Sequence, residues 1–223
     1  DLTVVSYNIQ FGRRIGAAPM PDGSSIYDYM DMAKVLEAHP GRDWPAVRMI
    51  NGKNDPTIIW NPKPTFYAAA QAARLPLLAH FTQMTHTAWD SDPEAQYIER
   101  INTREFVESM NEPYWNLFHF ALDRCTPAFS RFSLDDDPGN GDPADGDLRG
   151  GINRFVSWRR DSVVESADSL EMELYMFDHA PVETATVDVT PRRTRLLRRD
   201  PGRVFNWRNT RVADGTLVQE GQA

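Results

Sequence analysis

Residues 46–86 read AVRMINGKNDPTIIWNPKPTFYAAAQAARLPLLAHFTQMTH. The first apolar run, 46–50, lies between a proline and a turn-forming Asn-Gly pair, which predicts a short strand. Pro62 stands where a helix would begin, and the alanine-rich run 66–74 predicts that helix. The run 77–81 predicts a second buried strand. Strand, helix and strand in this order predict a βαβ unit, and therefore a parallel sheet covered by helices.

The loops that follow these two strands are the candidate site, because ligands of open α/β sheets bind at the carboxyl ends of the strands. The first loop carries Asp55 and the second carries His86. A carboxylate that accepts the Nδ1 proton of a histidine fixes its tautomer and leaves Nε2 as a general base. The pair therefore suggests the acid and base of a Ser-Asp-His triad whose serine precedes them. The ordinary alternative is a turn aspartate before a proline and a loop histidine without a role.

The segments outside this unit differ from one another in composition and in the pattern of apolar residues. A helix is expected from Ser24 or Ser25 to Ala38, and the stretch 135–151, rich in Asp, Gly, Pro and Asn, is expected to be a solvated loop or linker. Short alternating runs then predict strands of an all-β sandwich-like module at 154–158, 170–177, 184–189, 204–207 and 216–218. The predicted organisation is an α/β part over 1–130, an acidic loop or linker over 131–152, and a β-rich module over 153–223 that is cut at its C-terminus.

Two groups of motifs resemble a known family. The segments 50–55 and 63–67, together with Trp60 and Thr85-His86, look like the C-terminal part of an α/β-hydrolase catalytic domain of the esterase and peptidase type. The stretches 150–153, 157–158 and 187–193 look like the β-rich tail that follows this domain in some bacterial members.

This resemblance implies that Asp55 is the triad acid and His86 the triad base, with a carboxylic ester as the favoured substrate and a peptide as the alternative. Trp60 and Trp89, which are close in sequence to the pair, are expected to help form the wall of an apolar substrate pocket. The Gly-x-Ser-x-Gly elbow is absent from the 223 residues. We therefore expect a fragment of a longer, secreted or cell-envelope enzyme, which is inactive alone and needs no metal or organic cofactor.

Composition limits which other functional classes the protein can belong to. The chain has 24 Lys and Arg against 32 Asp and Glu, and its formal charge of −8 argues against general nucleic-acid binding. No apolar stretch approaches the roughly 20 residues that span a bilayer. Cys125 is the single cysteine, so the chain can form no internal disulfide. The sequence does not fix an oligomeric state.

A non-catalytic alternative is a protein whose β-rich module binds a carbohydrate or a partner. The arginine-rich stretch 192–211 interleaves Phe205 and Trp207, a composition that suits an acidic polysaccharide, although outer-face arginines are the simpler explanation. Three weaker resemblances concern a glycosidase-like glutamate, Glu112, a metal-dependent phosphoesterase-like first strand at 4–9, and a calcium loop at 135–147.

The three remaining histidines that we considered have ordinary structural interpretations. His80 lies inside an apolar run and is expected in the core or on a sheet face, His39 is expected at a helix end, and His119 is expected to pack between aromatic residues.

Overall fold

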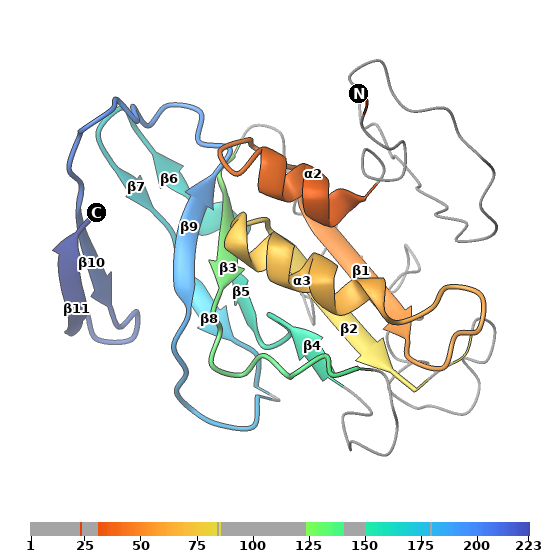
Figure 1. Cartoon of the computed structure of the whole chain (residues 1–223). Coiled ribbons are helices and arrows are strands. Elements are labelled where there is room, and N and C mark those ends of the chain that lie inside the picture. Colours follow the sequence, from red (N-terminus) through yellow and green to blue (C-terminus); the bar gives the residue numbers. More distant parts are fainter. Residues whose placement is uncertain (1–22, 24–30, 84, 86–123, 141–149, 179) are drawn as a thin grey trace.

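A computed structural model describes residues 23, 31–83, 85, 124–140, 150–178 and 180–223 (Figure 1). These residues combine α-helices with many short strands. In chain order the elements are α2 (Met32–Ala38), β1 (Val47–Gly52), α3 (Pro62–Ala72), β2 (Leu77–Thr82), β3 (Thr126–Ser130), β4 (Gly150–Ile152), β5 (Val156–Trp158), the 3-10 helix η3 (Arg160–Ser162), β6 (Val164–Glu165), β7 (Leu170–Glu171), β8 (Leu174–Met176), β9 (Asp188–Arg192), β10 (Asn206–Thr210) and β11 (Leu217–Gln222).

The predicted βαβ unit is confirmed. Strands β1 and β2 pair in parallel from Val47 opposite Leu77 to Gly52 opposite Thr82, and helix α3 makes the crossover between them. The prolines at the start of α3 occupy its first turn, where a missing N–H costs no helical hydrogen bond. Helices α2 and α3 lie side by side along the β1–β2 pair (Figure 1).

Helix α2 covers only the last seven residues of the helix that the sequence predicted from Ser24 or Ser25. It begins at Met32 because Asp31 Oδ1 accepts the N–H of Ala33 at 3.0 Å and so caps the first turn. His39 is its C-cap, which confirms the helix-end interpretation of this histidine. Residues 24–30 lie outside the described part of the chain.

Strand β2 is buried on both faces and separates two apolar clusters. Its residues Leu77, Ala79 and Phe81 face the cluster formed with α2 and α3. Leu78 belongs to a second cluster with residues of β3 and β5, such as Phe129. The alternation follows the two-residue period of a strand, and full burial explains why the run 77–81 is apolar except for His80.

The strands after residue 153 differ in length from the prediction, since β5 is shorter than expected whereas β10 and β11 are longer, and they form separate pairs. Strands β5 and β8 pair, as do β6 and β7, and β10 and β11, all in antiparallel fashion. The run 170–177 is split between β7 and β8, and the strand expected at 184–189 lies at 188–192, where β9 pairs with β3. The described fold is thus a mixture of helices and several small sheets, and a sandwich arrangement of these pairs stays a prediction.

Sheet pairing and packing join residues from both sides of the predicted domain boundary. Strand β4 pairs with β2, so the sheet has the order β1-β2-β4, and β9 pairs with β3. The second apolar cluster also combines Leu78 with Trp158. The division into three segments stays a prediction, and the contacts across it are extensive.

The first part of the acidic segment is bonded into the fold, where the sequence predicted a solvated loop. Asp135 accepts the backbone N–H of Asn153 at 2.6 Å and the side-chain amide of Gln71 at 3.0 Å. Asp136 accepts the N–H of Gly151 at 2.9 Å. These carboxylates attach residues 135–136 to α3 and β4. Residues 141–149 lie outside the described part.

Asn153 links the two sheets that contain β2 and β3. Its fully buried side-chain amide donates to the carbonyl oxygen of Leu77 at 2.9 Å and to that of Phe129 at 3.1 Å. Its backbone φ of 59° lies in the left-handed region, which Asn adopts more readily than most residues. One side chain therefore satisfies two buried carbonyl groups that belong to different sheets.

Neither described helix has the length and apolar character needed to cross a bilayer.

We expect Asn153→Asp to lower the free energy of unfolding by about 2 kcal/mol or more. The carboxylate has the shape of the amide but cannot donate, so it leaves two buried carbonyl groups unpaired and places a charge beside them. Urea unfolding measures the change. Asn209→Asp on the exposed strand β10 is the control, and equal stability of the two variants would contradict the linking role.

We expect stability to depend on pH through Asp135. Burial raises the pKa of Asp135 to about 6 from an ordinary value of 3.8, so the folded state binds the proton more tightly than the unfolded state. This contribution therefore favours folding at low pH and is lost as the pH rises through about 6. Asp135→Asn removes the titration.

The free energy of unfolding of the wild type minus that of Asp135→Asn should fall by about 2 kcal/mol between about pH 4.5 and 7.5. Urea unfolding at both pH values measures the difference. A difference that stays constant or grows with pH would show that Asp135 does not titrate in this way.

Candidate functional site

The carboxyl ends of β1 and β2 bring two candidate loops together. The backbone N–H of Lys53 donates to the carbonyl oxygen of Thr82 at 2.8 Å. One residue further, the side-chain amide of Asn54 donates to the carbonyl oxygen of Gln83 at 2.8 Å. The parallel register thus continues past the strands into the loop that carries Asp55 and into the segment that leads to residue 86. His86 itself lies outside the described residues.

Asp55 organises the turn that follows β1. Its Oδ1 accepts the backbone N–H groups of Thr57 at 2.8 Å and Ile58 at 2.9 Å. This is the turn role that the sequence offered as the ordinary alternative, and the half-buried carboxylate is fixed in orientation by it. Oδ1 can form the turn while Oδ2 accepts a further hydrogen bond, because each oxygen of the carboxylate has its own lone pairs.

Lys63 holds the other end of the same turn, a role that sequence analysis missed. Its Nζ donates to the carbonyl oxygens of Ile58 at 2.7 Å and Ile59 at 2.6 Å, and its side chain is buried. Burial lowers the pKa of Lys63, and the negative charge of Asp55 opposes this shift. The Asp55 loop is therefore clamped from two sides, by a carboxylate on its N–H groups and by an ammonium group on its carbonyl groups.

Trp60, expected at a pocket wall, lies in the core beneath this loop. Its ring is only 4% exposed and packs edge-on against Phe81 and Tyr67, with centroids 5.5 and 6.2 Å apart. The indole N–H donates to the carbonyl oxygen of Pro138 at 3.1 Å. Trp60 thus supports the site from below and joins it to the acidic segment. Trp89 lies outside the described residues, and the pocket-wall role of both residues stays a prediction.

A polar and aromatic cluster completes the floor of the site. The Lys53 ammonium group lies 5.1 Å from the centroid of the Trp60 ring and 4.8 Å from that of Phe81. The Tyr67 hydroxyl donates to Asn51 Oδ1 at 2.7 Å, and burial raises the pKa of Tyr67. The signal that could have identified these residues is spacing: Asn51 in β1 and Lys53 directly after it are two apart, and Lys63 and Tyr67 are four apart in α3.

The remaining candidates fall into two groups. His80 is fully buried in β2, as its apolar surroundings predicted. Glu112, His119 and the possible phosphoesterase-like strand at 4–9 lie outside the described residues. Within the described ranges, no three His, Cys, Asp or Glu side chains are grouped so that they could hold a metal ion.

Comparisons with protein-family models, with curated proteins and with solved structures found no match. The chemistry of the site is therefore argued from its own residues.

We expect Lys63→Met to loosen the loop between β1 and α3. Methionine keeps most of the buried aliphatic volume, but two carbonyl groups lose a charged donor, an interaction worth about 1.5–3 kcal/mol. Thermolysin should then cut near Ile58 and Ile59 about tenfold faster or more, because local opening becomes more frequent. Lys34→Met on the exposed face of α2 is the control. Equal cleavage rates in the two variants would exclude the clamp.

Proposed function

We propose that this chain supplies the acid and base of a serine hydrolase of the α/β-hydrolase type that cleaves carboxylic esters. The observation that carries the proposal is the hydrogen-bonded approach of the Asp55 loop to the segment that leads to His86, at the carboxyl edge of parallel strands. Side chains at this edge of an α/β sheet are in the position where such folds place their chemistry.

In the proposed mechanism, Asp55 accepts the Nδ1 proton of His86 and holds the imidazole in one tautomer. His86 Nε2 then removes the proton from a serine supplied by preceding sequence, and later returns it to the leaving alcohol. The two backbone N–H groups that bind Asp55 Oδ1 fix the direction of the carboxylate. A fixed carboxylate loses little freedom when it orients the histidine, which favours the reaction.

The surroundings of Asp55 support this role in a second way. Lys63 holds Ile58 and Ile59 through their carbonyl groups, and its charge is close enough to Asp55 for the two to influence each other. The loop is thereby held against α3 and cannot easily move away from the second strand end.

The test uses the natural polypeptide that contains this chain together with its preceding sequence, assayed on short-chain p-nitrophenyl esters. We expect Asp55→Asn and His86→Ala each to lower kcat/KM by about a thousandfold or more, because triad members act as a unit. Asparagine at position 55 keeps an oxygen for the N–H groups of Thr57 and Ile58, so the fold should survive.

Two variants serve as controls. Asp214 also accepts a backbone N–H two residues further along the chain, at 3.0 Å, so Asp214→Asn makes the same chemical change in a distant turn. His39→Ala removes a histidine from the end of α2. Both controls should keep wild-type activity. Hydrolysis that persists within about tenfold in Asp55→Asn and His86→Ala would overturn the triad.

A further inference from the structure

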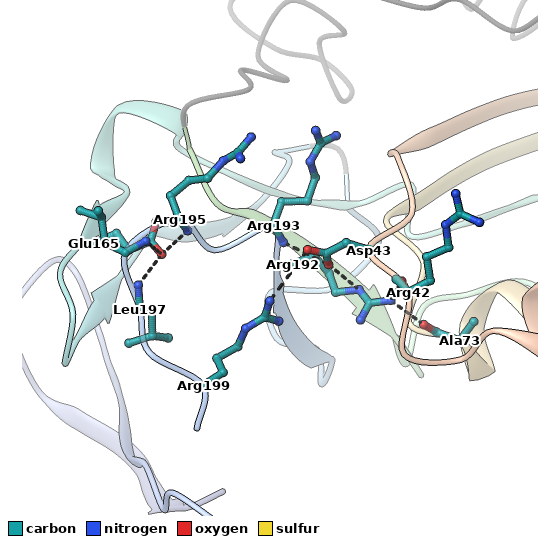
Figure 2. A network of polar contacts seen from close by, with 10 residues as sticks. Arg42, Asp43, Ala73, Glu165, Arg192, Arg193, Arg195, Leu197 and Arg199 are labelled. Atoms are coloured by element: carbon teal, nitrogen blue, oxygen red, sulfur yellow. Dashed lines mark hydrogen bonds and ion pairs between the residues drawn. The ribbon is translucent and has the colours of Figure 1, made fainter. Parts of the chain in front are cut away.

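A buried arginine attaches the end of β9 to the helical layer. The Arg192 guanidinium donates to the carbonyl oxygen of Arg42 at 2.9 Å and to that of Ala73, the C-cap of α3, at 3.1 Å. Its side chain is only 9% exposed and lies 3.9 Å from Asp43 (Figure 2). This contact brings the arginine-rich segment after β9 beside the loop between α2 and β1.

The positive charge gathered there exceeds the nearby negative charge. Asp43 is shared, since it lies 3.9 Å from Arg192 and 3.8 Å from Arg199 and also accepts the backbone N–H of Arg193 at 3.3 Å. Burial lowers the pKa of Arg192, and repulsion from Arg199 and Arg74 adds to this effect although Asp43 opposes it. The single carboxylate of Asp43 is therefore shared by the guanidinium groups of Arg192 and Arg199 and cannot neutralise both charges.

The second carboxylate in this region is engaged by the backbone. Glu165 Oε1 accepts three consecutive N–H groups, those of Arg195, Leu196 and Leu197, at 2.6, 2.9 and 3.0 Å. Burial alone would raise the pKa of Glu165, but these three hydrogen bonds outweigh it and lower the pKa. Glu165 thus shapes the segment 195–197 and keeps the arginines beside it in place.

Several guanidinium groups point outward from this network. Figure 2 shows the side chains of Arg42, Arg193 and Arg195 directed to the same side, away from Asp43. Arg42, Arg74, Arg195 and Arg199 are exposed, and Arg193 is half-buried. Their backbones are fixed by three separate parts of the fold, so the charges are held in an extended array before any ligand arrives.

We propose that this arginine face, defined as Arg42, Arg193 and Arg195, binds an acidic polysaccharide through its carboxylate or sulfate groups. Guanidinium groups form paired hydrogen bonds with such oxygens. The array crosses several elements on the surface, which suits a chain-like ligand that offers one anionic group after another. The proposal does not depend on the hydrolase proposal.

Charge distribution favours a polysaccharide over a nucleic acid. Residues 192–211 hold eight arginines and one aspartate, a formal charge of +7, so the other residues of the chain together carry −15. A duplex nucleic acid carries about one charge per 1.7 Å, and a chain with a total formal charge of −8 repels such a dense polyanion. A polymer with a charged group on some of its sugars matches a short positive face with much less repulsion.

The test is fluorescence anisotropy of the full 223-residue chain with labelled polygalacturonate and labelled heparin. Neutral dextran and a short DNA duplex serve as the comparison ligands. We expect both acidic polysaccharides to bind more tightly than DNA, dextran not to bind, and affinity to fall steeply between about 50 and 200 mM salt. Arg193→Gln with Arg195→Gln should weaken polysaccharide binding about tenfold or more, because two charge-assisted contacts are lost.

Arg208→Gln with Arg211→Gln is the matched control, since it removes the same charge from the exposed β10–β11 hairpin and its flank. Circular dichroism and melting temperatures of both double variants show that they are folded. The proposal is supported if only the Arg193 and Arg195 variant loses affinity. Equal losses in the two variants, tighter binding of DNA, or no polysaccharide binding at low salt would each overturn it.

Discussion

The side-chain amide of Asn153 is the contact on which the described fold depends. It donates to Leu77 in β2 and to Phe129 in β3 from a fully buried position. Strand β2 has helices over one face and the cluster containing Phe129 and Trp158 over the other, so its backbone cannot reach water. Any element that packs there must satisfy the carbonyl groups it covers. Asn153 satisfies one carbonyl group in each of two strands that belong to different sheets. It thereby holds the sheet of β3 against β2.

The same strand, β2, fixes the position of the candidate site. Because β2 is held on both faces, its carboxyl end and that of β1 are fixed, and Lys53 and Asn54 extend the pairing into the loops. Lys63 then ties the loop of Asp55 to α3. Short-range polar contacts thus transfer the order of a buried sheet to residues at its edge, which a reacting carboxylate requires.

The sequence predicted the β1–α3–β2 unit because its signals are local. Prolines mark the start of α3, alanines its body, and an apolar run marks a strand buried on both sides. The partners of β3 and β4 could not be predicted in this way. Strand β4 is two glycines and an isoleucine, and it is a strand only because β2 offers an open edge beside it. Such pairing depends on residues about seventy positions away, which no local pattern contains.

The same limit applied to individual side chains of the site. Asp55 was proposed as a site residue because a carboxylate after a strand is a recognisable pattern, whereas Lys63 resembles any lysine in the first turn of a helix. Its position under Ile58 and Ile59 is visible only when the loop is folded back on α3. Trp60 was predicted at a pocket wall from its sequence distance alone, and the pattern does not show that its ring is buried in an apolar cluster with its indole N–H on the carbonyl oxygen of Pro138.

The arginine-rich stretch shows why composition cannot separate structural from surface roles. Arg192 and Arg203 have the same side chain, yet Arg192 is buried on the carbonyl oxygens of Arg42 and Ala73, while Arg203 pairs with Asp168 at 2.7 Å and lies over the Phe205 ring. A buried guanidinium group needs oxygens as partners, and the loop before β1 and the end of α3 each provide one. Once Arg192 occupies that position, its neighbours are carried to the surface beside Asp43. The outward charge is therefore a consequence of one inward arginine, and the fold that buries Arg192 also fixes the array around it.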